Sequence, residues 1–295
     1  MNWQMLVIFN AVLIGCSMVI MRVIARDKRN ADAAFAVNAL QFVALWVTGL
    51  VLAPSLGHVH VYVLSKFLWR FIGGGLAFAL TSVATYKSLT YVDAAVGTII
   101  YALNAVTTTG LAVFTLHEGL SALQVFGGVI LVAAITYSLL AVHARGNRRS
   151  LHNLLYGLGY ALIAAVFYAI AIVNEKWLLG QMSAATYVVF GWGWQMLAAV
   201  VVGVLLQPKR FKQIWRPQSL GWIASMGMLR GVAGAAFVLA EVRSNNVSLV
   251  SVIANFRLII VMILGAWLLK ERDRLRQKAV GALASLAGLT MLMWK

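Results

Sequence analysis

The chain has 295 residues, of which 62% are hydrophobic and 11% charged, and its mean hydropathy is +0.88. A soluble domain carries about twice that share of charge. The formal net charge of +16 does not indicate nucleic-acid binding, because the long apolar stretches leave no polar face to hold a duplex. One cysteine and three prolines exclude a disulfide scaffold and a proline-rich linker. These values predict a polytopic membrane protein.

Ten stretches are long and apolar enough to cross a bilayer, which takes about 20 residues. The connections between them are short, so none can fold as a soluble domain, and the first stretch lacks the features of a cleaved signal peptide. We therefore predict an all-α membrane protein with ten transmembrane helices. These cover residues 3–25, 33–54, 66–88, 93–115, 119–142, 152–178, 184–206, 217–241, 246–269 and 276–294.

The 24 lysines and arginines are divided unevenly between the two ends of these helices. The odd-numbered connections hold 16 of them and the opposite side holds five, which leaves Arg22, Arg230 and Arg257 inside the spans. Basic loops stay in the cytoplasm. The distribution therefore predicts odd connections in the cytoplasm and both termini outside, in the inner membrane of a cell. Most of this charge is expected to set orientation and to contact lipid headgroups.

The sequence repeats at an offset of 153 residues, which aligns 91–128 with 244–281 without a gap. Two halves of five helices each lie in opposite senses across the bilayer, and such inverted repeats place a substrate site between them near the membrane centre. We predict halves at 1–146 and 147–295, within one integral membrane domain. The polar and glycine identities at this offset are Glu118 with Glu271, Gln124 with Gln277, and Gly128 with Gly281.

The repeated motif is an apolar helix ending in L-x-E, a short turn, and Q-x-x-G in the next helix, seen here as LHEGLSALQVFGG and LKERDRLRQKAVG. Over the whole chain this pattern resembles the EamA-type branch of the drug/metabolite transporter superfamily. The resemblance implies a ten-helix carrier of small metabolites, often an exporter, without an ATPase module. Relatives commonly have proline early in the fourth and ninth helices. Ala105 and Leu258 stand there in this chain, so no proline hinge is carried over.

Two arginines lie near the middle of predicted helices, Arg230 in the eighth and Arg257 in the ninth. A charge at this depth is costly and usually marks a substrate or ion path. Guanidinium groups suit carboxylate and phosphate, so one interpretation is a cavity for an anionic substrate. The other is structural pairing with carboxylates or carbonyls. Arg257 matches Asn104 at the repeat offset, and Asn255 is expected on the opposite helical face from Arg257.

Aromatic and amide side chains give further candidates for substrate contact. Tyr101 shares one stripe of the fourth helix with Asn104. Trp192, Trp194 and Gln195 lie in the middle of the seventh helix, where an interfacial aromatic belt would not place two tryptophans, and Trp194 and Gln195 are the candidates for substrate contact. These tryptophans either stack on an aromatic substrate or pack against small residues, and Tyr168 is a similar candidate.

Three acidic residues lie near the ends of predicted helices. Glu175 either couples a proton to transport or forms an interfacial pair with the adjacent Lys176. Glu118 and Glu271 lie at the tight turns of the repeated motif, where helix capping is the expected role.

Small residues suggest two close helix contacts. One is GMLRG at 227–231, and the other is the set Gly281, Ser285 and Gly288, which is a candidate dimer face. The five histidines lie at helix ends or in loops, so no metal site is predicted, and we expect no cofactor.

The leading hypothesis is a secondary active transporter that moves a small polar, carboxylate-bearing metabolite, such as an amino acid or organic acid, by alternating access, with export favoured. Its partners would be that small molecule and the lipid bilayer, with no nucleic acid, and the protein would be a monomer or homodimer. Two alternatives remain: a flippase or carrier for an anionic lipid-linked or phosphorylated group, and an exporter of drugs or aromatic metabolites. A membrane enzyme is not expected, since no catalytic cluster stands out.

Overall fold

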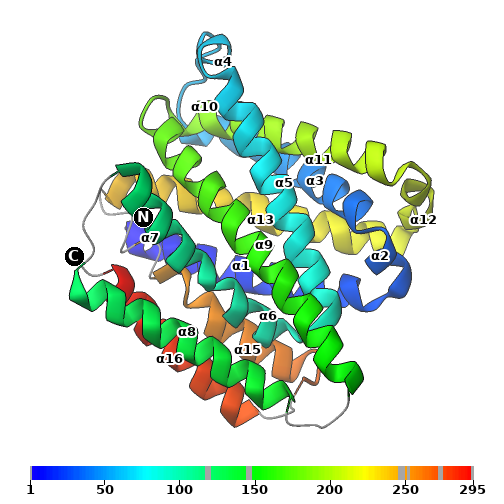
Figure 1. Cartoon of the computed structure of the whole chain (residues 1–295). Helices are drawn as coiled ribbons and strands as arrows, with labels where there is room; N and C mark the ends of the chain where they lie inside the picture. The colour runs from blue at the N-terminus through cyan, green and yellow to red at the C-terminus, as the bar shows by residue number, and fades with distance from the viewer. Residues whose placement is uncertain are drawn as a thin grey trace.

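The computed structural model describes residues 2–116, 121–143, 148–244, 250, 253–271 and 275–293. All regular secondary structure in these residues is helical, and the helices gather into one bundle (Figure 1). The all-α prediction is thus confirmed, as expected where no water can satisfy an open backbone. Within these residues, seven helical segments have the length and composition to cross a membrane, and 122–138 and 257–268 are shorter apolar helices. The count of ten spans stays a prediction.

Local sequence signals explain where the helices of the first half begin and end. The Asp27 side chain accepts a hydrogen bond from the backbone N–H of Arg29 and so separates α1 from α2. Gly57 ends α3 with a φ of 124°, which glycine adopts without a steric penalty. The helices are α1 (Trp3–Arg26), α2 (Lys28–Asp32), α3 (Ala34–Leu56), α4 (Val63–Lys66), α5 (Leu68–Tyr91), α6 (Ala94–Tyr101), α7 (Leu103–Leu116) and α8 (Ala122–His143).

The second half contains one irregular turn within a long apolar helix. A π-helical segment, η1, lies between α10 and α11, and π segments of this kind are frequent at functional sites. The elements are α9 (Arg148–Leu179), α10 (Ala184–Thr186), η1 (Tyr187–Gly191), α11 (Trp192–Leu206), η2 (Pro208–Arg210), α12 (Phe211–Ile214), α13 (Pro217–Ser244), α15 (Arg257–Trp267) and α16 (Leu275–Met293).

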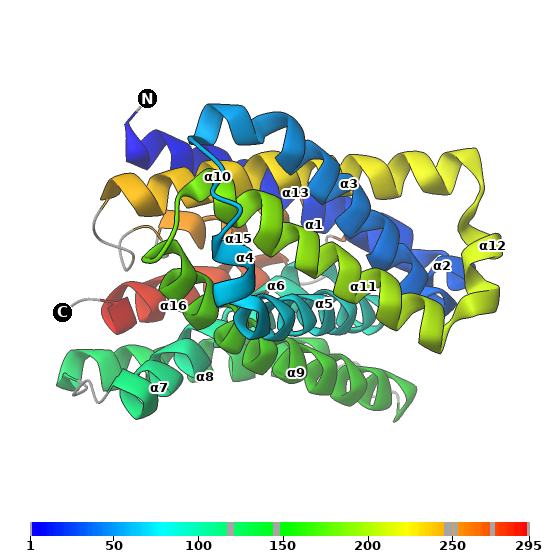
Figure 2. The ribbon, with the colours of Figure 1, turned by 90° about the horizontal axis from the view of Figure 1, so that it is seen from above.

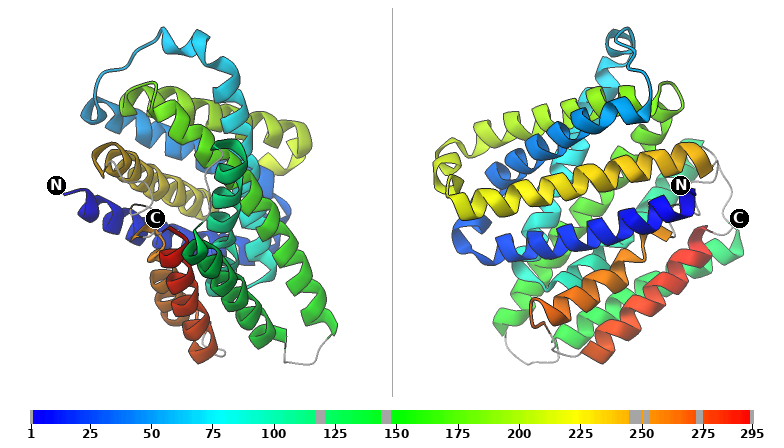
Figure 3. Two further views of the ribbon diagram at one scale, coloured as in Figure 1. Left: turned by 60° about the vertical axis from the view of Figure 1, so that its left-hand side comes forward. Right: turned by 180° about the vertical axis from the view of Figure 1, so that it is seen from behind.

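The two halves interleave, so that the closest helix pairs join one half to the other. Helix α1 packs on α13 and α15, α3 packs on α13 and α11, and α5 packs on α9 and α11. Figure 3 shows α1 beside α13, and Figure 2 shows α3 and α13 on one side of the bundle with α8 and α9 on the other. The α1–α13 contact has its counterpart in α9–α5, with the halves exchanged, as two equivalent repeats require.

The fourth and ninth predicted helices are both interrupted, at positions that match in the repeat. Helix α6 ends at Tyr101 and α7 begins at Leu103, while α15 begins only at Arg257. A short backbone hydrogen-bonded turn marks each break, from the N–H of Ala105 to the carbonyl of Ala102 and from the N–H of Leu258 to the carbonyl of Asn255. The first turn lies inside the apolar segment Ala94–Leu111, which has the length and composition of one span. The breaks form without proline, and broken helices near mid-membrane are typical of transporter sites.

Glycines allow two close helix contacts inside the chain. A Cβ at Gly227 would lie 2.4 Å from the Gln41 carbonyl of α3, so the predicted contact at 227–231 is present. A Cβ at Gly288 would lie 2.7 Å from the Gly127 carbonyl of α8. A Cβ at Gly281 would lie against the side chain of Ser138, also on α8. The small residues of α16 therefore pack against α8 of the same chain, and the assignment of this face to a dimer was wrong.

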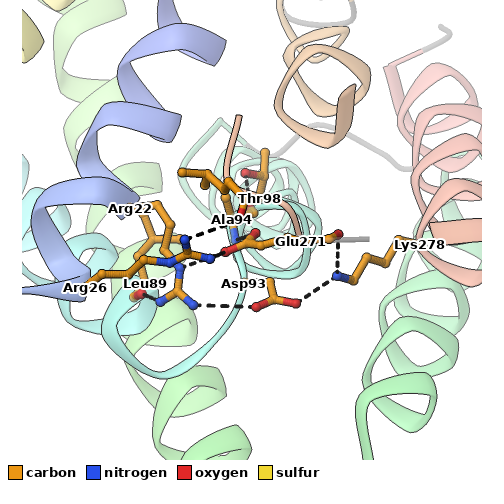
Figure 4. A network of polar contacts seen from close by, with 9 residues as sticks. Arg22, Arg26, Leu89, Asp93, Ala94, Thr98, Glu271 and Lys278 are labelled. Carbon is orange, nitrogen blue, oxygen red and sulfur yellow. Dashed lines mark hydrogen bonds and ion pairs between the residues drawn. The ribbon is translucent and has the colours of Figure 1, made fainter. Parts of the chain in front are cut away.

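Glu271 acts as a cap, but for a distant helix. Its side chain accepts the backbone N–H of Ala94, at the start of α6, at 3.0 Å (Figure 4). Local sequence could not show this, because the capped helix belongs to the other half of the chain. Glu118, the matched residue of the first half, lies outside the described residues.

Candidate functional site

A cavity of about 240 Å³ lies inside the bundle, and helices of both halves supply its walls. Its size is near the lower end of ligand pockets, which run from about 300 to 1,000 Å³, so it suits a small metabolite. Most of the predicted site residues meet here. The cavity-lining residues among them are Tyr101, Asn104, Tyr168, Glu175, Gln195, Arg230 and Arg257.

Arg230 reaches the cavity from α13 and is held by weak, uncharged acceptors. Its Nε donates to the hydroxyl of Ser17 at 3.3 Å and its Nη1 to that of Ser82 at 3.4 Å. Its Nη2 lies 3.5 Å from the sulfur of Met21 and 3.8 Å from that of Met18. No carboxylate in the described part of the chain pairs with this guanidinium, so its charge is left uncompensated within hydrogen-bonding distance.

Arg257 is the first residue of α15, directly after the turn that interrupts the ninth predicted helix. It also lines the cavity. Its guanidinium carbon lies 5.4 Å from the centre of the Tyr101 ring, within the range of a cation–π contact. Its Nη2 donates to the side-chain oxygen of Asn255 at 3.3 Å. The prediction that these two side chains occupy different faces was wrong, because it assumed a continuous helix at residues where the chain makes a turn.

Aromatic rings form the wall beside the two arginines. The rings of Tyr101 and Tyr168 meet edge to face at 5.4 Å, and Phe78 packs edge to face on Tyr168 at 6.4 Å. Tyrosine rings thus flank the arginine side of the cavity.

Glu175 lies in the cavity wall and is not an interfacial partner of Lys176. Its side chain is buried and accepts the hydroxyl hydrogen of Tyr187 at 3.0 Å, and that hydroxyl accepts a hydrogen bond from Gln195 at 3.3 Å. Lys176 is exposed. The π-helical turn carries Tyr187, so this irregularity helps to set the Glu175 contact. The interfacial reading was therefore wrong.

The seventh helix presents Trp192 to the cavity, whereas Trp194 is outside its lining. Two residues apart on a helix point in nearly opposite directions, so only one of the pair can face inward. Trp192 also packs between glycines, since a Cβ at Gly49 or Gly234 would lie within 3 Å of its ring. Packing against small residues and exposure to the cavity thus occur together. Trp194 instead lies over α5, where its carbonyl approaches Gly75.

Several cavity residues were missed by sequence reasoning. Asn10, Gln41, Ser82 and Thr85 line the cavity from α1, α3 and α5, which had contributed no candidate. Gln41 Oε1 is buried without a hydrogen-bond partner, so it offers the cavity a free acceptor. A signal for them existed, since each is a polar residue well inside an apolar span. Within the described residues no cluster of three or more His, Cys, Asp or Glu can hold a metal ion.

These observations define a class: a duplicated, all-helical membrane protein with interrupted helices around a central cavity lined by two arginines. The sequence matches the EamA-like transporter family twice, over residues 1–140 and 155–294, and the chain belongs to that family. It is therefore a multi-pass membrane protein of a transporter family and not of an enzyme family. The predicted boundary at 146 falls between the two matches and remains untested.

A solved crystal structure, titled only as that of a protein, shares the fold. It aligns with a TM-score of 0.63 over 95% of each chain, at 15% sequence identity. No curated protein matches the sequence. The similarity therefore supports the fold and carries no substrate.

Proposed function

We propose that the protein is a secondary active transporter that exports a small carboxylate-bearing metabolite, an amino acid or organic acid, across the inner membrane by alternating access. The observation that carries this proposal is that two arginines, Arg230 and Arg257, line one cavity and that no described carboxylate pairs with either.

The physical argument starts from the cost of a charge inside a membrane, which is at least a few kcal/mol for an arginine at mid-depth. Hydroxyls, sulfur atoms and an aromatic ring offset only part of that cost. A substrate carboxylate supplies the missing charge and accepts two parallel hydrogen bonds from a guanidinium fork. The two guanidinium groups thus destabilise the protein when the cavity is empty, and binding of a substrate carboxylate offsets that cost.

Glu175 supplies the negative group of the same cavity, and we propose that it couples transport to a proton. Its carboxylate is buried against Tyr187 and lies close enough to Glu241 and Tyr168 to interact with them electrostatically. When no substrate is bound, a proton on Glu175 neutralises this carboxylate and so removes the cost of burying its charge. An ammonium group of an amino acid would serve the same purpose when substrate is bound.

Aromatic metabolites are the second candidate substrate class. Tyr101, Tyr168, Phe78 and Trp192 all line the cavity and offer ring faces or edges to a planar group. A carboxylate that carries an aromatic group would use both the arginines and this wall.

The orientation in the membrane also remains our proposal. The basic residues of α2 and α12 lie at one end of the bundle, and the start of α1 and the end of α16 lie at the other (Figure 1). The positive-inside rule places the basic end in the cytoplasm and both termini outside.

The test is transport in proteoliposomes, with candidate substrates first chosen by their ability to raise the melting temperature of the purified protein. Arg257→Ala should reduce uptake of a labelled carboxylate by at least tenfold, and Arg257→Lys should retain part of it. Arg216→Gln, an exposed arginine outside the cavity, is the matched control. Normal uptake by folded Arg257→Ala would contradict the proposal that Arg257 binds the substrate carboxylate. Stabilisation by anionic lipid-linked groups alone would favour the flippase alternative.

A further inference from the structure

An ion-pair network joins the two halves of the chain at one end of the bundle (Figure 4). Arg22 of α1 meets Glu271 at 3.1 Å and Asp93 at 3.5 Å. Arg26, one turn further along α1, reaches the same Glu271 oxygen at 2.7 Å. Lys278 of α16 pairs with Asp93 at 2.8 Å. The first family repeat supplies Arg22, Arg26 and Asp93, and the second supplies Glu271 and Lys278.

The network is largely buried. The side chains of Glu271 and Lys278 are each 4% exposed and that of Arg22 is 11% exposed. Arg22 also donates to the carbonyl of Leu89, at the end of α5, and Glu271 holds the first N–H of α6. Removing one partner of a buried pair leaves an uncompensated charge, so such contacts resist separation. The network therefore ties α1, α5 and α6 to the α15–α16 connection.

The network lies directly beyond the cavity. Met18 and Thr85 line the cavity, and Arg22 and Leu89 follow them by one helical turn on α1 and α5. Between the two lies a buried apolar layer that includes Met21, 1% exposed, and Leu89. Apolar side chains and then the ion pairs thus follow the cavity toward this end of the bundle.

We propose that this network is the latch of that end of the transporter: it is intact in the state seen here and breaks when the cavity opens toward α2 and α12. The inference rests on the alternating-access function proposed above, because such a carrier must open each end in turn. Every ion pair to Glu271 joins the two halves, so the halves cannot part at this end while the pairs persist.

The repeat does not reproduce this latch at the other end. At the offset of 153 residues, Arg22 corresponds to Glu175 and Glu271 corresponds to Glu118. Two carboxylates cannot form the ion pair that Arg22 and Glu271 form. The two ends of the carrier would therefore close by different chemistry, with the ion pairs biasing the resting protein toward closure at this end.

Thiol accessibility in membrane vesicles tests the latch without any substrate. In a Cys16→Ser background, Thr85→Cys reports from the latch end of the cavity and Phe237→Cys from the opposite end. A membrane-impermeant thiol reagent is added from the side of α2 and α12, in vesicles of determined orientation. Arg22→Gln and Glu271→Gln should each raise the labelling rate of Thr85→Cys on the order of tenfold, the response of a two-state equilibrium that loses a strong bias.

A matched pair of measurements separates a latch from general loosening. Labelling of Phe237→Cys from the opposite side should fall in the same variants, whereas a loosened fold would label faster from both sides. Arg216→Gln, which changes an exposed arginine outside the network, should change neither rate. If Glu271→Gln does not fold, Asp93→Asn provides the second variant, because that side chain is 33% exposed.

The proposal is overturned if the folded variants Arg22→Gln and Glu271→Gln are labelled from both sides at the rates of the unmodified protein. If Glu271→Gln does not fold, the same criterion applies to Arg22→Gln and Asp93→Asn. It is also overturned if labelling rises equally at the two ends. If the unmodified protein does not transport carboxylates, the proposed substrate is contradicted. The latch proposal still stands on the labelling rates, because these are measured without substrate.

Discussion

The contact of α13 with α3 gives a sharp test of the fold, because a single methyl group is enough to disturb it. At Gly227 an added Cβ would lie 2.4 Å from the carbonyl oxygen of Gln41 and 2.6 Å from the Cβ of Ala44. One obstacle is backbone and the other is the short side chain of alanine, so no rotamer change can relieve the clash. The helices must separate by about 1 Å to reach ordinary van der Waals contact, at 3.4 Å or more.

We expect Gly227→Ala to destabilise the protein by about 1–2 kcal/mol. Overpacking of a tight contact costs about 1–3 kcal/mol. The better helix propensity of alanine returns up to about 1 kcal/mol. A loss of that size lowers the melting temperature of a large chain by roughly 5 °C. Transport should fall as well, since Arg230 lies one turn further along the displaced helix.

The assay is thermal unfolding of purified protein in detergent, with Gly221→Ala as the matched control. Gly221 lies on the same helix, but a Cβ there meets nothing within 4 Å. This control should melt at or slightly above the temperature of the unmodified protein. If Gly227→Ala melts no lower than Gly221→Ala, the close approach of α13 and α3 is refuted.

Two further predictions concern proton coupling and the α8–α16 contact. Glu175→Gln should abolish accumulation of substrate driven by a pH gradient, whereas substrate exchange without a gradient should persist. Both are measured in proteoliposomes. Unchanged gradient-driven accumulation would exclude Glu175 as the coupling group. Gly288→Ala should lower the melting temperature by several degrees, because its Cβ would meet the Gly127 carbonyl at 2.7 Å, and should leave the mass measured by light scattering unchanged. If the variant changed its oligomeric state without losing stability, the result would favour a contact of this α16 face with a second copy of the chain over the contact with α8.

Sequence reasoning found seven of the cavity residues because a polar group in a membrane span is expensive and must face the protein interior. That argument identifies Arg230 and Arg257 without any knowledge of the neighbouring helices. It chose Trp194, whereas Trp192 lines the cavity, because the rotation of a uniformly apolar helix about its axis is set by its neighbours. It also misplaced Asn255, because a local break changes the face of every residue beside it.

The same limit explains Glu175 and Glu271. Each appeared to lie near the end of an apolar stretch, where solvent or a neighbour in sequence would satisfy it. Their actual partners, Tyr187 for one and Arg22 for the other, come from separate helices. A pairing over 249 residues leaves no periodic trace in a single sequence.

The amino-acid sequence by itself determined that this is an all-helical membrane protein, that it is built from two matching halves, and that two arginines fall within its apolar stretches. Hydropathy and charge act over whole segments, so they can be read without a fold. Only the tertiary structure decided which polar side chains share one cavity, where the fourth and ninth helices break, and that ion pairs join the two halves at one end. These features depend on the packing of distant segments, whose contacts arise only when the halves interleave.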